Sequence, residues 1–481
     1  MKYFLTLIQL WVGFLSICAS YPKANIWIIP SVESPQVYRN YAQTSKVHLE
    51  MARGEVEHIQ LVFPSKVNEE YRFTFDRYLK GIQISARELK KMNGYYDALV
   101  PFKNQLKCTD TLTAVWITVQ CPSRVPVGKY HQTIKIEGSK HFTIQLDYNV
   151  HHTTIPLKSS IPITVGVENR CMTECLNDKE ADKERQRWVD FVLSYRMTPV
   201  FGTQITPERW QYEHSFSPWA WNDKRSIRLL NDRRYSCYML PFFTLSENEL
   251  ASLLCNIQKK GKLKESLFYI WDEPAYMEDY EQIKRKVNII RKYASDARIL
   301  TTFFCGPRNG PRKGDLYAVF DYLKHHIHVA TISLAPCKGN EEEVQHIRYK
   351  VPEGIDWWSY VCWQPGGNEP NFLLQMKGIQ QRAIMWRTWK NGSQGFLYWN
   401  CNIYHKRNPF TYITDMPHGD GILIYPGDIL GCKGPIASAR LERWRDGAEE
   451  MELLRLVEKN YSKEKADTLL NIVYSLSLIH I

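Results

Sequence analysis

Leu267-Phe-Tyr-Ile-Trp-Asp-Glu-Pro274 is an apolar run that ends abruptly at two adjacent carboxylates, Asp272 and Glu273. Such a run is typical of a buried strand, and in a parallel α/β sheet or barrel the functional side chains gather where strands end. Pro274 disfavours helix at Glu273, so we expect the acids at a defined strand terminus. The alternative is a capping pair for a helix that begins near Glu278. The stretch therefore indicates an α/β domain with candidate catalytic acids at its strand ends.

Strands and helices alternate on both sides of this stretch, from about residue 156 onward. The runs that read as strands are Ile161–Glu168, Thr198–Gly202, Tyr235–Phe243, Leu267–Trp271, Arg298–Cys305, His328–Leu334, Trp357–Trp363 and Gly395–Trp399. Helical patterns long enough for right-handed crossovers lie between them. Eight such units over roughly 300 residues match a (β/α)8 barrel in size. A doubly wound open sheet is the rival, but no Gly-rich phosphate loop follows any of these strands.

An all-β region precedes this alternation. Residues 24 to about 150 contain short runs of β-branched and aromatic residues separated by turn signals, for which a β-sandwich is the economical fold. The sequence therefore predicts an α/β protein with a sandwich domain over 21–155 and a (β/α)8 TIM-like barrel over 156–481. We assign a strongly charged last helix, Ala437–Glu458, to the barrel and expect most of its charges on a solvated or ion-paired face.

Residues 1–20 read as an export signal peptide. A basic residue is followed by a mostly apolar run and then by the small residues Cys18-Ala19-Ser20. The run is too short to favour a transmembrane span. Leu15-Ser-Ile-Cys18 resembles a bacterial lipoprotein box, but Ile17 is larger than the residue usual before the cysteine, so lipidation at Cys18 stays open beside simple cleavage. We expect an exported protein that is periplasmic, held at the cell surface or secreted.

The composition is that of a globular protein and does not indicate nucleic-acid binding. The net charge of +11 is spread along the chain without a long basic block, so nucleic acid is not an expected partner. Aromatic residues make up 13% of the chain, which suits sugar binding by ring stacking but also a large aromatic core. No zinc-type Cys/His spacing is present, and we expect neither a metal nor another cofactor. The oligomeric state is not indicated.

The adjacency of Asp272 and Glu273 constrains their chemistry. Successive residues of a regular strand point to opposite faces, so the strand must depart from regularity if both acids serve one substrate. Neighbouring acids that share a site titrate apart, which suits a general acid beside a fixed anion. A retaining glycosidase with its own nucleophile needs carboxyl groups about 5 Å apart on either side of the bond, which adjacent residues reach with difficulty. A substrate-assisted enzyme avoids this requirement, because the sugar's 2-acetamido oxygen attacks C1.

Several motifs resemble one family of enzymes. They are Ala52-Arg-Gly-Glu-Val-Glu-His-Ile-Gln60, Trp271-Asp-Glu-Pro274, Trp357-Trp-Ser-Tyr-Val-Cys362, Gly419-Asp-Gly-Ile-Leu-Ile-Tyr-Pro-Gly427 and Ser438-Ala-Arg-Leu-Glu-Arg-Trp-Arg-Asp-Gly447. Together they resemble glycoside hydrolase family 123 and its uncharacterised relatives. The resemblance implies a β-N-acetylgalactosaminidase with an N-terminal sandwich and a barrel that uses an Asp-Glu pair.

The resemblance also implies roles for individual residues. Glu273 would be the general acid/base, and Asp272 would accept a hydrogen bond from the acetamide N–H. Tyr360 would hold the acetamide carbonyl, with core packing as its alternative. The other candidate substrate-binding residues are Trp271, Trp358, Trp363, Trp399, Asp420 and Tyr425. Each aromatic residue could instead pack in the hydrophobic core. Asp420, which lies between two glycines, could instead stabilise a turn.

The sequence therefore predicts an exported, exo-acting, retaining glycosidase that releases terminal β-linked N-acetylgalactosamine. Its partner would be a glycan carried by a glycolipid, a glycoprotein or a polysaccharide. A barrel glycosidase of another sugar specificity and a non-catalytic carbohydrate-binding relative are the alternatives, because fold resemblance alone does not determine the substrate.

Overall fold

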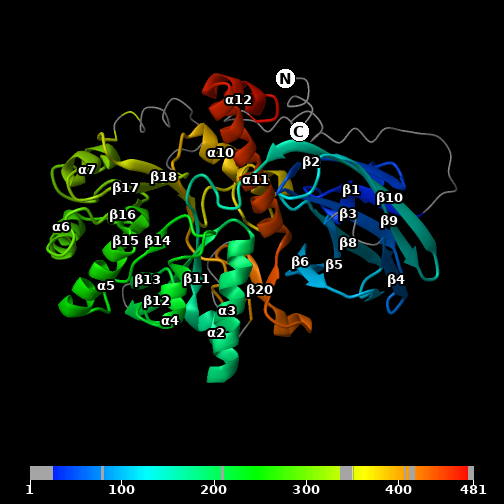
Figure 1. Cartoon of the computed structure of the whole chain (residues 1–481), viewed down its shortest axis with the longest axis horizontal. Helices are drawn as coiled ribbons and strands as arrows, with labels where there is room; N and C mark the ends of the chain where they lie inside the picture. Colours follow the sequence, from blue (N-terminus) through cyan, green and yellow to red (C-terminus); the bar gives the residue numbers. More distant parts are fainter. Residues whose placement is uncertain are drawn as a thin grey trace. The chain divides into compact units, whose positions relative to one another are not determined.

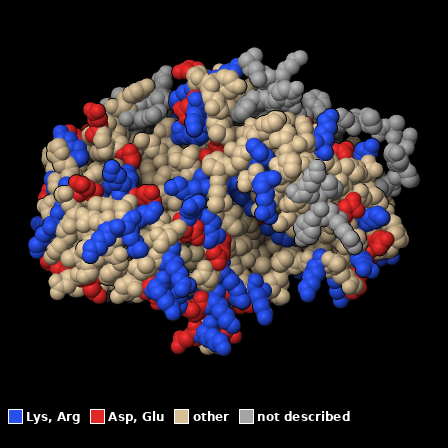
Figure 2. All heavy atoms as spheres, viewed as in Figure 1, with Lys and Arg blue, Asp and Glu red and all other residues tan. Residues whose placement is uncertain are grey.

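The computed structural model describes residues 25–76, 81–206, 211–335, 349, 351–405, 408–410 and 418–474 (Figure 1). The predicted signal peptide and Cys18 lie outside the described residues. Within these ranges no helix is both long and apolar enough to cross a membrane. Basic and acidic side chains are interspersed over the face in view in Figure 2.

The chain divides into two compact units. The sandwich unit contains the described parts of 1–157, 374–386 and 427–481, and the barrel unit contains those of 158–373 and 387–426. The charged helix predicted over Ala437–Glu458 therefore falls in the sandwich unit, whereas the sequence analysis assigned it to the barrel. Periodicity along a helix does not reveal which distant element it packs against.

The sandwich consists of two five-stranded sheets. The first has the order β1 (Trp27–Pro30), β3 (Val56–Pro64), β8 (Leu112–Gln120), β5 (Gln83–Met92) and β6 (Tyr95–Pro101), all antiparallel. The second has the order β2 (Lys46–Arg53), β10 (His141–Thr154), β9 (Gly128–Glu137), β4 (Glu70–Phe75) and β7 (Gln105–Lys107), with only β2 and β10 parallel. The predicted sandwich is confirmed.

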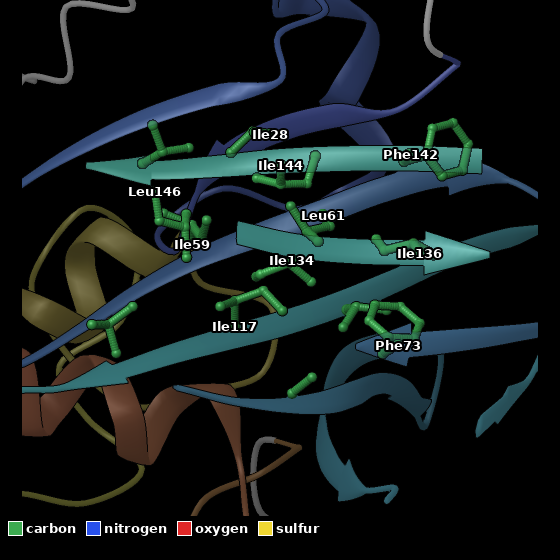
Figure 3. Close-up of a cluster of buried hydrophobic side chains, with 14 of the residues drawn as sticks. Ile28, Ile59, Leu61, Phe73, Ile117, Ile134, Ile136, Phe142, Ile144 and Leu146 are labelled. Carbon is green, nitrogen blue, oxygen red and sulfur yellow. The ribbon is translucent and has the colours of Figure 1, made fainter. Parts of the chain in front are cut away.

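The core of the sandwich follows from strand alternation. In β9, Ile134 and Ile136 are buried while Lys135 between them is exposed. They pack with Leu61 of β3 and Ile117 of β8, side chains of the opposite sheet (Figure 3). Burying large aliphatic side chains contributes about 1.5–3 kcal/mol each, so this layer is the main source of the unit's stability.

The barrel unit contains a nine-stranded sheet with all eight predicted strands. Its order is β13 (Gln211–Ser215), β12 (Thr198–Thr206), β11 (Ile163–Glu168), β19 (Phe396–Tyr398), β18 (Asp356–Val361), β17 (Val329–Ser333), β16 (Ile299–Phe303), β15 (Ser266–Trp271) and β14 (Tyr238–Met239). Eight strands are parallel, and β13 is antiparallel to β12. The N–H of Phe216, just after β13, donates to the Met239 carbonyl of β14 at 2.7 Å, so the sheet is nearly closed. The predicted barrel is confirmed, and β13 is an addition to it.

Helices connect the parallel strands, and α5, α6 and α7 lie outside them in Figure 1. The longer ones are α3 (Asp178–Ser194), α5 (Glu247–Lys259), α6 (Met277–Arg291) and α7 (Leu316–Leu323), and the shorter are α2 (Asn169–Thr173), α4 (Lys224–Leu229), η2 (Leu263–Glu265), α9 (Gly378–Arg382) and α10 (Ile384–Lys390). The remaining elements are η1 (Pro35–Asn40), β20 (Ile424–Pro426), η3 (Gly427–Leu430), β21 (Pro435–Ala437), α11 (Ala439–Asn460) and α12 (Lys463–Asn471). Helix α5 begins at a capping box formed by Ser246 and Glu249, which supplies partners for its first N–H groups.

Inward-facing side chains fill the barrel. Leu267 and Tyr269 of β15 belong to one buried cluster with Trp358 and Tyr360 of β18. Trp358 leaves no room beside it, because a Cβ on Gly395 would lie 2.2 Å from its ring. The barrel interior is therefore a packed core, and only its mouth is left for ligands.

Helix α11 carries the ion pairs that the sequence analysis gave as one alternative, but most of these charged side chains are buried. In its first half the charged side chains are removed from solvent: Arg440 is 1% exposed, and its Nη2 lies 2.9 Å from Oδ2 of Asp97, itself 2% exposed. Glu442 is fully buried and pairs with Arg87 of β5 and with Arg445. The ion pairs therefore hold the C-terminal helix against the sandwich strands.

We predict that Asp97→Ala lowers the free energy of unfolding by about 3–5 kcal/mol, because it removes the carboxylate that the buried Arg440 guanidinium binds. Denaturant unfolding followed by circular dichroism measures the change. The double variant Asp97→Leu/Arg440→Met should recover part of the loss.

The matched control is Lys91→Ala, which breaks an exposed 2.7 Å pair with Asp110 and should cost at most about 1 kcal/mol. Equal effects of the two single substitutions would contradict a structural role for the buried pair.

Candidate active site

A cavity of about 1110 Å³ lies at the carboxyl ends of the barrel strands. Asp272 and Glu273, directly after β15, line it together with Trp271. Trp399 lines it from the end of β19, and Lys286 from α6. All lining residues belong to the barrel unit. The structure thus brings both predicted acids to one pocket.

The strand end departs from regular geometry, as the adjacency of the acids requires. The pairing of β15 with β16 shifts register between Tyr269 and Trp271. Glu273 then has φ +44°, in the left-handed region that residues with a Cβ occupy at a cost of about 1–2 kcal/mol. This turn lets two successive side chains, Asp272 and Glu273, reach the same cavity.

Asp272 is held on one side by two hydroxyl groups. Tyr269 Oη and Thr302 Oγ1 each donate to its Oδ1 at 2.7 Å. No described residue hydrogen-bonds to its Oδ2. Two anchored bonds orient the carboxylate and leave its second oxygen available to a donor in the cavity.

Glu273 is positioned by two other strands. Its N–H donates to Thr302 Oγ1 of β16 at 3.0 Å, and the Tyr360 hydroxyl of β18 donates to its Oε1. The pKa of Glu273 is raised to about 7: burial in the mouth is the largest cause, the charge of Asp272 adds to the rise, and the Tyr360 hydrogen bond opposes it. The side chain is open to the cavity, so substrate can reach it, while the surrounding mouth removes enough water to disfavour its charge. Glu273 is thus suited to give up and take back a proton near neutral pH.

Two of the predicted rings line the cavity. Trp271 and Trp399 are both half-buried and present part of their surface to it. Asp420 is buried behind Trp399 and accepts from its Nε1 at 3.0 Å and from the Tyr398 hydroxyl at 3.1 Å. Asp420 therefore orients a ring of the cavity wall and does not itself line the cavity.

The other predicted side chains do not meet at this pocket. Trp358 and Tyr425 are 2% and 0% exposed, in the core. Trp363 is 43% exposed, stacks on Phe304 and is not among the lining residues. Tyr360 is buried and contacts Glu273, whereas the resemblance placed its hydroxyl on a substrate carbonyl. Trp358, Trp363 and Tyr425 therefore do not line the cavity that holds the two acids.

Two cavity residues escaped the sequence analysis. His214 of β13 stacks on Tyr269 with ring centroids 4.3 Å apart, and burial lowers its pKa to about 4, so it is neutral. The polar strand Gln211–Ser215 carries no apolar run, and only the alternation of Tyr212, His214 and Phe216 signals it. Lys286 lies in a helix whose charged face reads as ordinary solvated surface.

No three His, Cys, Asp or Glu side chains are grouped to hold a metal ion in the part of the chain that the structure describes.

Comparison with known proteins identifies the family. The model of the glycoside hydrolase 123 catalytic domain matches residues 183–457. Among solved structures, the chain resembles a family 123 glycoside hydrolase from Clostridium perfringens studied for glycolipid glycan hydrolysis, at 14% identity and a TM-score of 0.65, over 93% of this chain and 92% of that one. A family 2 β-galacturonidase from Eisenbergiella tayi, bound to galacturonate, aligns at 8% identity over 83% of this chain and 90% of that one, with a TM-score of only 0.36. No curated protein sequence gives a significant match.

The likeness to the C. perfringens structure extends over most of this chain, so it supports the fold of both units. The family model covers more than half of the chain and includes both acids of the cavity. The protein is therefore a glycoside hydrolase and belongs to glycoside hydrolase family 123.

Proposed function

We propose that the protein releases terminal β-linked N-acetylgalactosamine from glycans by a retaining, substrate-assisted mechanism. The observation that carries the proposal is the unequal environment of the two adjacent acids. Asp272 is fixed through one oxygen by Tyr269 and Thr302, and Glu273 has a pKa raised to about 7. One acid is built to accept a hydrogen bond and the other to transfer a proton.

Because both acids follow the same strand, the substrate is a better candidate for the nucleophile than a second carboxylate of the enzyme. Both follow β15, so they approach the sugar from the same strand end. An enzyme nucleophile and a general acid must instead lie on opposite sides of the scissile bond, about 5 Å apart. When the acetamide oxygen of the sugar supplies the nucleophile, the second carboxylate only has to orient the acetamide.

The reaction then proceeds in two steps. Glu273 donates its proton to the glycosidic oxygen as the bond to C1 breaks, and the acetamide carbonyl oxygen bonds to C1. Asp272 accepts the acetamide N–H and stabilises the positive oxazolinium ring through its free Oδ2. The Glu273 carboxylate next takes a proton from water, whose oxygen attacks C1 and reopens the ring with retention of configuration.

The resemblance to family 123 supports the choice of sugar, and the N-terminal sequence supports the site of action. Family 123 implies N-acetylgalactosamine as the terminal sugar, and the half-buried rings of Trp271 and Trp399 offer apolar faces for it. The apolar segment over residues 1–20 supports export, so the proposed substrates are glycans outside the cytoplasm, with lipidation at Cys18 left open.

Glu273→Gln removes the proposed proton donor. We expect kcat/KM on an unactivated β-GalNAc disaccharide to fall by about 10²–10⁴-fold, with a smaller loss on the dinitrophenyl glycoside, whose leaving group needs no proton. Glu281→Gln, on α6 and outside the cavity, is the control and should keep wild-type activity. Equal losses on the two substrates would argue against general acid catalysis.

Asp272→Asn replaces the acceptor of the acetamide N–H by a group that can present a donor to it. We expect kcat on nitrophenyl β-GalNAc to fall by about 10²-fold or more, because the lost contact strengthens as positive charge develops. Weaker inhibition by a GalNAc-thiazoline should accompany the loss. Full activity of the purified variant would remove Asp272 from the mechanism, and equal turnover of the β-galactoside would remove the acetamide.

The raised pKa of Glu273 predicts a pH dependence. The acid must be protonated in the free enzyme, so kcat/KM should decrease as the pH rises above about 7. In Asp272→Asn this limb should move to lower pH, because the negative neighbour that raises the pKa is gone.

The pH dependence of the protein's thermal stability should also reflect the raised pKa of Glu273. A carboxyl group that titrates at about 7 when folded stabilises the fold fully below about pH 4.3 and loses this contribution as the pH approaches and passes 7. Glu273→Gln avoids that loss, so its melting temperature should gain on the wild type between pH 5 and pH 8. A constant difference across this range would show that the Glu273 pKa is ordinary.

A further inference from the structure

Lys286 is the one lysine or arginine among the described residues that line the catalytic cavity. It projects from α6, where its Nζ lies 4.5 Å from the ring centroid of Phe243 and 5.7 Å from that of Trp271. Both rings line the same cavity. The positive charge of Lys286 thus lies beside two aromatic rings, and one of them, Trp271, directly precedes the catalytic acids in the sequence.

No described carboxylate pairs with this ammonium group. The other cavity acids already have donors: Glu278 accepts from Asn309 Nδ2 at 3.0 Å, and Asp279 accepts from backbone N–H groups at the start of α6. Two neighbouring lysines differ, since Lys284 of α6 lies 3.4 Å from Glu281 and Lys292, just after α6, lies 2.9 Å from Glu247. Among these three lysines, Lys286 is therefore the one without a carboxylate partner among the described residues.

The environment of Lys286 is unfavourable for a charge without a counter-ion. Burial lowers the pKa of Lys286, and no nearby acid raises it again. Contacts with ring faces return only about 0.5–2 kcal/mol of the lost hydration. An arriving anion would be bound strongly, because substrate displaces water from the mouth and charge-assisted hydrogen bonds strengthen there.

The cavity has room for such a group beside the terminal sugar. Pockets that enclose drug-sized ligands measure about 300–1,000 Å³, and this cavity of about 1110 Å³ exceeds that range. A single monosaccharide would leave much of it empty.

We propose that Lys286, with the rings of Phe243 and Trp271, forms a subsite for an anionic group of the bound saccharide, either a carboxylate or a sulfate ester. The subsite rests on the proposed function for the terminal sugar and adds charge to its specificity. The preferred substrates are then acidic glycans. The ammonium group binds the anion, while the rings pack against the apolar face of the sugar that carries it.

Lys286→Met tests the subsite, because methionine keeps an unbranched stem against the rings and removes the charge. Two matched pairs of substrates locate the anion: nitrophenyl β-GalNAc with its 6-O-sulfate, and β-GalNAc linked to glucose or to glucuronic acid. The wild type should prefer the anionic member of at least one pair by about tenfold or more in kcat/KM. Lys286→Met should bring that ratio close to one, and Lys286→Arg should retain most of it.

Lys284→Met, which removes one charge from the same helix outside the cavity, should leave the ratio unchanged. A preference confined to the sulfate pair places the subsite at the terminal sugar, and one confined to the glucuronate pair places it at the neighbouring sugar. No preference in either pair, or a preference that survives in Lys286→Met, would overturn the proposal.

A binding measurement separates this proposal from the proposed function. Calorimetry of the Glu273→Gln variant with the same saccharides gives dissociation constants without turnover. If the wild type hydrolyses no β-GalNAc, the mechanism fails, yet a tighter Kd for the anionic members that disappears in Glu273→Gln/Lys286→Met still supports the subsite. Equal dissociation constants, or no binding of any member, would refute it.

Discussion

One hydroxyl group, Thr302 Oγ1, connects the two acids on which the site depends. It donates to the Asp272 carboxylate and accepts from the backbone N–H of Glu273. Strand geometry alone would direct these successive side chains to opposite faces. The hydroxyl compensates part of the cost of the left-handed turn at Glu273, because it gives the displaced N–H a partner. A residue of β16 thus determines how β15 ends.

The acids differ because separate strands surround them. Tyr269 of β15 holds Asp272 and is itself stacked against His214 of β13, whereas Tyr360 of β18 holds Glu273. Burial raises the pKa of both tyrosines well above that of free tyrosine, so their hydroxyls remain donors at any working pH. The neutral His214 adds no charge that would disturb this balance. Barrel closure therefore converts two similar side chains into an acceptor and a proton carrier.

The fold was readable from the sequence wherever one strand produced one strong local pattern. All eight parallel strands are β-branched or aromatic runs bounded by turns, and each appears in the barrel. Strand β13 was missed because Gln211–Ser215 is polar and lacks such a run.

The sequence did not show which side chains are buried in the core and which line the cavity. Trp358 and Trp399 both occur in apolar strand sequences, yet the first fills the barrel and the second lies beyond the last residue of β19 at its mouth. Likewise, Asp97, which binds Arg440, and Arg87, which binds Glu442, lie more than 300 residues away, so helical periodicity could not show that these charges are buried. The acid pair was found because adjacency itself is a local signal.

The placement of α11 has a consequence for how the protein is made. The sandwich unit combines the beginning of the chain with its end, since Asp97 of β6 binds Arg440. During synthesis the strands emerge first, and the guanidinium that compensates Asp97 emerges some 343 residues later. Until then the buried carboxylate has to remain hydrated, so the β6 edge cannot reach its final packing. A chain cut short before α11 therefore lacks the guanidinium group that pairs with Asp97 in the complete sandwich unit.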